Sequence, residues 1–167
     1  IELVNVTFPN LQDIFVQDAQ NRTDGILITS TGDYAAVDTT IRGFKSNRIN
    51  TALKVRGRTE GVYLDHMIAV DVKCGVDWVA SLSASGGKKP LLLLNSSHIN
   101  TDGIAVKTVD VSQVIGSDSL IYITNSTTAE SVAFDFQATG SLSNENSQIG
   151  HVTIIRLGSR VGSLAAC

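Results

Sequence analysis

Residues 58–78 read RTEGVYLDHMIAVDVKCGVDW and contain three short apolar segments in a single run. Apolar and polar side chains alternate within the segments, and the turn-forming residues Asp65 and Gly75 separate them. This is the pattern of strands that bury one face. The segments are residues 62–64, 68–72 and 76–79, the last of which ends one residue beyond the quoted stretch. The run therefore predicts one coil of a stacked β-solenoid, and copies of it should fill the rest of the chain.

Two independent series repeat through the chain. In the first, an apolar residue precedes a small polar one, at spacings of 33, 27, 30, 29 and 26 residues. Its members are Val4-Asn5, Val37-Asp38, Leu64-Asp65, Leu94-Asn95, Ile123-Thr124 and a degenerate Ile149-Gly150. In the second, a small residue precedes an apolar-x-apolar triplet, at Gly25, Ala52, Gly75, Gly103 and Ser131. Series of this period are typical of stacked repeats, so we expect an all-β parallel solenoid of about six coils.

Length and composition indicate one folded body. The 167 residues are 43% hydrophobic and 17% charged, with a net charge of -3, which disfavours a nucleic-acid partner. No apolar run is long enough for membrane insertion. We expect a single domain over residues 1–167, a flexible insertion at residues 81–89 and a fading terminal coil at residues 147–167. The first residue is Ile1 rather than methionine, which suggests a piece of a longer chain.

No cofactor and no metal site are expected. The sequence has neither a glycine-rich phosphate loop nor a cysteine pair with metal-ligand spacing. The three histidines, His66, His98 and His151, fall in different coils, and a metal would need ligands on adjacent ones. Cys74 lies in an apolar run, which is typical of a buried, inert thiol.

The pattern over residues 55–62, followed by Leu64-Asp65 and residues 72–76, resembles the right-handed, single-stranded parallel β-helix of phage tailspikes and capsule depolymerases. This is the pectate-lyase-like class, and the resemblance is strongest over residues 35–106. It implies a homotrimer at the tip of a phage tail that binds, and often cleaves, a capsule or O-antigen polysaccharide. The partners would then be that polysaccharide and other phage tail proteins, and the location the virion, outside the bacterium.

Asp71 and Asp77 are the candidate catalytic residues. Each alternates with apolar neighbours, so both side chains should point outward, and glycan hydrolysis needs a pair of carboxyl groups. Carboxylates that keep the outer sheet surface solvated are the alternative interpretation.

Aromatic residues supply candidate sugar contacts, because a flat ring with a polar group stacks on a pyranose. We expect Tyr63 to face outward, Tyr122 to occupy the equivalent position two coils later and Leu93 to lie between them. This stripe would be a ligand platform or a subunit interface. Trp78 would either fill the core or stand at a corner beside Asp77, and Glu60, just before a strand, completes the candidate substrate-binding residues.

Three hypotheses about function follow. The first is recognition, with or without hydrolysis, of a bacterial surface polysaccharide. The second is a non-catalytic structural β-helical shaft or receptor-binding spacer, which provides length and rigidity while the site lies elsewhere on a longer chain. The third is a polysaccharide lyase, for which Arg42, Lys54, Arg56 and Arg58 offer positive charge without a recognisable calcium cluster.

Overall fold

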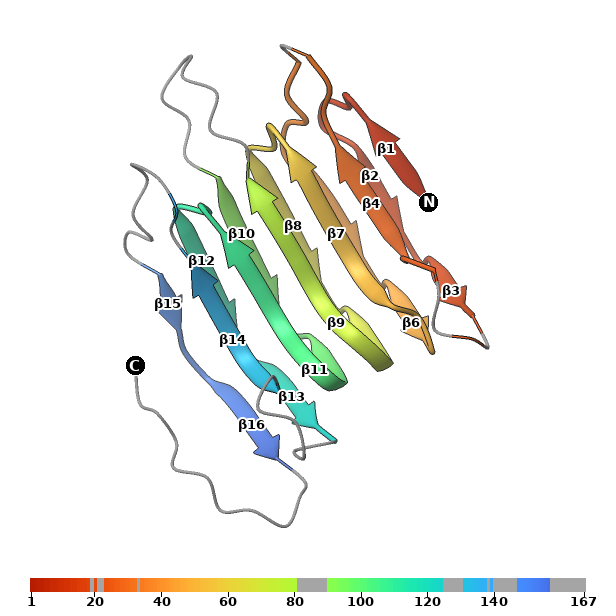
Figure 1. The fold of residues 1–167 in the computed structure, drawn as a ribbon, viewed down its shortest axis with the longest axis vertical. Helices are drawn as coiled ribbons and strands as arrows, with labels where there is room; N and C mark the ends of the chain where they lie inside the picture. The colour runs from red at the N-terminus through yellow and green to blue at the C-terminus, as the bar shows by residue number, and fades with distance from the viewer. Residues whose placement is uncertain are drawn as a thin grey trace.

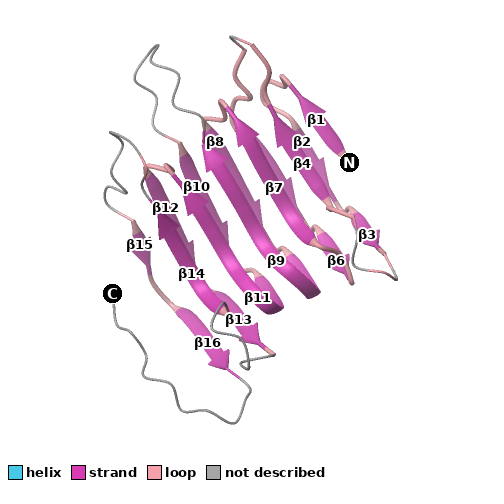
Figure 2. Ribbon diagram, in the orientation of Figure 1, coloured by secondary structure: helices cyan, strands magenta, loops and turns pink. Residues whose placement is uncertain are grey.

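The computed structural model describes residues 1–18, 20, 23–32, 34–80, 90–124, 131–137, 139 and 147–156. These residues form strands, turns and loops without any helix (Figure 2). The described part accordingly contains no helix that could cross a lipid bilayer. The predicted all-β class is confirmed. The predicted insertion at residues 81–89 and the segment 157–167 lie outside the described residues.

The strands fall into three rows, and every pairing between strands in the described residues is parallel. The first row is the six-stranded sheet of β2 (Asn10–Gln12), β5 (Thr39–Arg42), β8 (Gly61–Asp65), β10 (Leu91–Asn95), β12 (Gln113–Ser117) and β15 (Gln148–Ile149). The second row contains β3 (Phe15–Gln17), β6 (Lys45–Asn47), the first halves of β9 (Ile68–Ala80) and β11 (His98–Val109), β13 (Ser119–Ile123) and β16 (Val152–Arg156). The third row contains β1 (Glu2–Val4), β4 (Ile26–Thr29), β7 (Thr51–Gly57), the second halves of β9 and β11, and β14 (Val132–Gln137).

The chain visits the rows in a fixed order, first, second and third, before it returns to the first row one strand further along. Figure 1 shows the result as strands side by side in chain order, with β1 and β16 at opposite ends. The sequence separation between register partners ranges from 22 to 33 residues. Leu94 and Gly116 are one pair with the smallest separation, and Ile115 and Gln148 are one with the largest. These parallel, repeating pairings are consistent with a parallel β-solenoid.

A residue with a left-handed backbone conformation lies at each corner between the first and second rows. One such residue follows every first-row strand at the same register position, and its φ lies between 47° and 63°. The residues are Asp13, Gly43, His66, Ser96, Asp118 and His151. The N–H group of Ser96, for example, still donates to the carbonyl oxygen of Ser117 at 3.1 Å, so the hydrogen bonds between neighbouring strands continue through the corner.

The bend inside β9 lies at Asp71 and not at Gly75. Asp71 has a φ of 53°, and Arg48, one strand earlier, has a φ of 55° at the equivalent position. Gly75 lies within the strand, where an added Cβ would come 2.5 Å from the carbonyl oxygen of Ala105. The prediction of a break at Gly75 is therefore wrong, because this glycine provides room for the neighbouring strand rather than a turn.

Alternating residues from all three rows fill the core. Leu64 and Leu94 of the first row, Ile99 of the second, and Val55 and Trp78 of the third are fully buried. Burying a side chain of this size contributes roughly 1.5–3 kcal/mol, so the repeated pattern of Val, Ile and Leu stabilises the whole stack.

Candidate functional site

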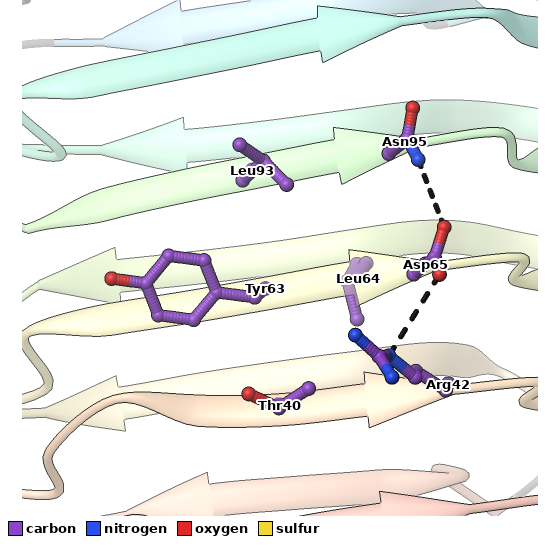
Figure 3. Close-up of a pocket in the computed structure, with 7 residues that line it drawn as sticks. All are labelled: Thr40, Arg42, Tyr63, Leu64, Asp65, Leu93 and Asn95. Carbon is purple, nitrogen blue, oxygen red and sulfur yellow. Dashed lines mark hydrogen bonds and ion pairs between the residues drawn. The ribbon is translucent and has the colours of Figure 1, made fainter.

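A shallow groove of about 450 Å³ lies on the outer surface of the first row, across β5, β8 and β10 (Figure 3). Strand alternation turns every second side chain of these three strands outward, and parallel register aligns them. The groove is lined by Thr40, Arg42, Tyr63, Leu64, Asp65, Leu93 and Asn95. It has an apolar half and a polar half.

The polar half is a line of side chains at the last position of successive strands. The Asn95 side-chain amide donates to the Asp65 carboxylate at 2.9 Å, and the Ser117 hydroxyl donates to the Asn95 amide oxygen at 2.8 Å. On the other side, Arg42 Nε lies 3.8 Å from Asp65. The line exists because Arg42, Asp65, Asn95 and Ser117 share one register position.

Asp65 is an ionised acceptor in this line. Burial by itself would raise the pKa of its carboxyl group, but hydrogen bonds from Asn95 and His66 and the nearby His66 and Arg42 charges outweigh that effect and lower the pKa. The imidazole Nδ1 of His66 lies 2.9 Å from the carboxylate. A carboxyl group in this state accepts hydrogen bonds well and is a poor general acid.

Tyr63 and Leu93 form the apolar half of the groove. They are register partners on β8 and β10, and Figure 3 shows the Tyr63 ring extending away from Asp65. The Tyr63 hydroxyl donates to Asp38 Oδ1 at 3.3 Å. Burial and, secondarily, the Asp38 charge raise the pKa of Tyr63, so its hydroxyl stays protonated and keeps donating. The Tyr63 ring is therefore held by its attachment to β8 at one end and by the hydrogen bond to Asp38 at the other.

Tyr63 is the predicted site residue that lines this groove, and its predicted neighbour Leu93 lines it as well. Glu60 directly precedes β8 and accepts a backbone hydrogen bond from Leu91 at 2.8 Å, but it is outside the groove lining.

Tyr122 lies in a different row, and the predicted stripe through Tyr63, Leu93 and Tyr122 is wrong. Tyr122 pairs with Asn100 in the second row, where its ring packs against His98 with centroids 5.5 Å apart. The register partner that continues from Leu93 is Ile115.

Trp78 belongs to the core. Its side chain is fully buried, which confirms the first of the two positions expected for it and excludes a corner position in contact with a surface ligand.

Asp71 and Asp77 both lie on β9, away from the groove. Asp77 is in the third row, in an ion pair with Arg56, whereas the exposed Asp71 forms the bend between the second and third rows. Neither lines the groove. Their catalytic role stays a prediction.

Asp65 and Asn95 were not predicted as binding residues, although a signal was present, and Arg42 was named only as a source of positive charge for a lyase. Leu64-Asp65 and Leu94-Asn95 are members of the first repeat series, and the side chains of Leu64 and Leu94 point inward. The polar residue after each leucine must then point outward at the end of its strand. Treating these residues only as turns concealed that they stack in register.

The described residues contain no group of three or more His, Cys, Asp or Glu placed to hold a metal ion. Burial raises the pKa of the Cys74 thiol to about 12, and the Asp77 charge adds to that effect. The thiol is therefore protonated at neutral pH and is not a nucleophile. The groove offers hydrogen-bond donors, acceptors and a ring, which are groups for binding a polyhydroxylated molecule.

No family model matches the chain, and neither the curated proteins nor the solved structures contain a significant match.

Proposed function

We propose that this chain is a right-handed, single-stranded parallel β-helix of six coils, of the phage tailspike type, that recognises a bacterial surface polysaccharide through the first-row groove. Each row has six strands or half-strands among the described residues, with β9 and β11 each contributing to two rows, and this supports the number of coils. Right-handedness agrees with the strong preference of parallel crossover connections.

The observation that carries the proposal is the pairing of an aromatic-apolar half with a polar half on one outer surface. Tyr63 and Leu93 present a partly apolar platform, and the carboxylate and amide of Asp65 and Asn95 stand two positions further along the same strands. A pyranose has an apolar face and a rim of hydroxyl groups, so it can contact both halves at once.

The groove supports binding better than hydrolysis. Glycoside hydrolysis uses two carboxyl groups roughly 5–9.5 Å apart, one of them with a raised pKa. Asp65 is the single carboxyl residue in the lining, and its pKa is lowered. A site of this kind holds a sugar without supplying the acid that cleavage needs.

On this proposal the chain works on a phage tail, at the outer surface of the bacterium, next to other tail proteins. The bound chain would be a capsule or an O-antigen.

The test is to incubate the full chain with a panel of capsular and O-antigen polysaccharides. Binding is measured by calorimetry, and reducing ends and unsaturated uronates are measured separately. Binding without either product supports the proposal. Reducing ends would show a hydrolase and unsaturation a lyase, and Asp71→Asn and Asp77→Asn would then test the predicted catalytic pair. If no polysaccharide binds, on a panel that includes the host's own glycan, the proposal is wrong and the structural-shaft hypothesis is favoured.

A further inference from the structure

Arg42 is the cationic residue in the lining of the first-row groove, and its side chain is 63% exposed. Among the described residues its guanidinium donates no hydrogen bond, because its contact with Asp65, at 3.8 Å, is longer than a hydrogen bond. An exposed ion pair at this distance contributes little to stability. The five N–H groups of the guanidinium can therefore bind a ligand.

Asp65 does not depend on Arg42 for its own hydrogen bonds. Its Oδ1 atom accepts from the Asn95 amide and lies 2.9 Å from Nδ1 of His66, whereas Oδ2 is the atom nearest Arg42. On the other side of Arg42 the register partner is Gln12, whose side chain is uncharged. Because a guanidinium has more than one donor edge, a second carboxylate can bind Arg42 without displacing a hydrogen bond of Asp65.

The guanidinium lies within the groove. Figure 3 shows the Arg42 side chain folded back from the end of β5 towards the middle of the groove. Thr40, two residues earlier on the same strand, also lines the groove, and its hydroxyl makes no hydrogen bond to any described residue. Strand alternation points both side chains outward, roughly 7 Å apart. A hydroxyl and a guanidinium thus offer donors at the same end of the groove.

The opposite end of the groove is unsuited to an anion. The Tyr63 hydroxyl already donates to the Asp38 carboxylate there. Gly61 leaves room for both groups, since an added Cβ would clash with Asp38 Oδ1 and lie 3.0 Å from the Tyr63 ring. A negative charge at this end would face Asp38, so an acidic ligand has one favourable orientation, with its charge at Arg42.

We infer that Arg42 makes the groove selective for a polysaccharide with a carboxylate on one of its sugars, such as a uronic acid. The inference rests on the proposed function, because it names the class of sugar that this groove would bind. A planar guanidinium matches a carboxylate through two parallel N–H···O bonds. The apolar face of the sugar then packs on Tyr63 and Leu93, so the groove recognises both the ring and its acidic group.

The test compares uronate-containing polysaccharides of the panel with the same polymers after carbodiimide activation and borohydride reduction. Reduction converts each carboxylate into a hydroxymethyl group and leaves the rest of the polymer unchanged. Calorimetry should show that the wild-type chain binds the reduced polymer about tenfold more weakly, because the charge-assisted hydrogen bonds are lost.

Arg42→Gln should weaken binding of the acidic polymer about tenfold and binding of the reduced polymer less than about twofold. A purely structural effect on the groove would weaken both equally. Arg42→Lys keeps the charge without the planar fork and should restore only part of the loss. Arg48→Gln is the matched control, because Arg48 is exposed at the bend between the second and third rows and does not line the groove.

Equal binding of acidic and reduced polymers, equal losses for both polymers in Arg42→Gln, or binding of neutral polymers alone would overturn the inference and leave the proposed function intact. An equal loss in Arg48→Gln would overturn it too, because the charge effect would then lie outside the groove. Absence of binding by every polymer, native or reduced, would instead refute the proposed function, and the inference with it.

Discussion

The Asn95 side chain donates a hydrogen bond to the Asp65 carboxylate at 2.9 Å although 30 residues separate the two in the sequence. The bond joins equivalent positions of β10 and β8, and Ser117 and Arg42 extend it to the strands on either side. The same line of side chains therefore stabilises the stack and forms the polar half of the groove. Its contribution to stability should depend on pH.

Acid should destabilise the chain through Asp65. Because its pKa is lowered in the folded state from the ordinary 3.8, the unfolded chain takes up the proton first as the pH falls. The stabilisation is complete well above pH 3.8 and disappears as the pH falls through the folded-state pKa. Hydrogen bonds from Lys54 and Asn50 lower the pKa of Asp24 against the opposing effect of burial, so Asp24 acts in the same direction.

Urea unfolding between about pH 5 and pH 2 measures this effect. Asp65→Asn should be less stable than the wild type at the upper end of that range, and the difference should shrink towards the lower end. A difference that stays constant with pH would contradict the assignment of a lowered pKa to Asp65.

Replacement by glycine should change the free energy of unfolding in opposite directions at two neighbouring serines, Ser96 and Ser97. Ser96 occupies the left-handed corner with a φ of 47°, a conformation that costs a non-glycine residue about 1 kcal/mol or more. Ser96→Gly should raise the free energy of unfolding by about 0.5 kcal/mol, once the greater freedom of glycine in the unfolded chain is subtracted.

Ser97 is the matched control for that change. It is buried, and its hydroxyl donates to the carbonyl oxygen of Asn95 at 2.9 Å. Ser97→Gly should lower the free energy of unfolding by about 1–2 kcal/mol, because buried polar groups lose their partner. Denaturant titrations of the two variants check the signs, and destabilisation by both changes would refute the strain assigned to Ser96.

Trp78 should report on the core. As the sole tryptophan and fully buried, it should fluoresce at short wavelength and resist quenching by iodide. Trp78→Ala should cost about 3–5 kcal/mol through the cavity it leaves. Trp78→Phe should cost far less, because the indole N–H is buried without a hydrogen-bond partner among the described residues, and removing it relieves a desolvation penalty. Circular dichroism during urea unfolding compares the two variants.

Much of the third row could be predicted from the sequence. Gly25, Ala52 and Gly75 of the second repeat series lie at one register position, as expected. The later members do not, because Ala105 rather than Gly103 stands beside Gly75. A shift of two residues leaves the same side chains pointing inward, so the hydrophobic pattern specifies the row and the inward face but not this register.

The groove was harder to predict because the number of residues between register partners varies, from 22 for Leu94 and Gly116 to 33 for Ile115 and Gln148. The first series matched Ile123-Thr124 to Leu94-Asn95, but the register partner of Leu94 is Gly116, which has no apolar side chain to reveal it. This error assigned Tyr122 to the wrong row. Strand alternation predicted correctly that Tyr63 and Leu93 face outward. The first series predicted correctly that they are neighbours, because it matched Leu64-Asp65 to Leu94-Asn95 in the observed register.

Tyr63 should contribute most of the apolar contact with a bound sugar. Removal of the ring in Tyr63→Ala should weaken binding of the polysaccharide about tenfold, which corresponds to ~1.4 kcal/mol. Tyr63→Phe keeps the ring and loses the hydrogen bond to Asp38, so it should weaken binding only about two- to threefold. Tyr34→Ala is the control, because Tyr34 is 70% exposed but does not line the groove. Calorimetric titration of the four proteins with the glycan selected by the panel gives the ranking, and an equal loss in Tyr34→Ala and Tyr63→Ala would show that the sugar binds elsewhere.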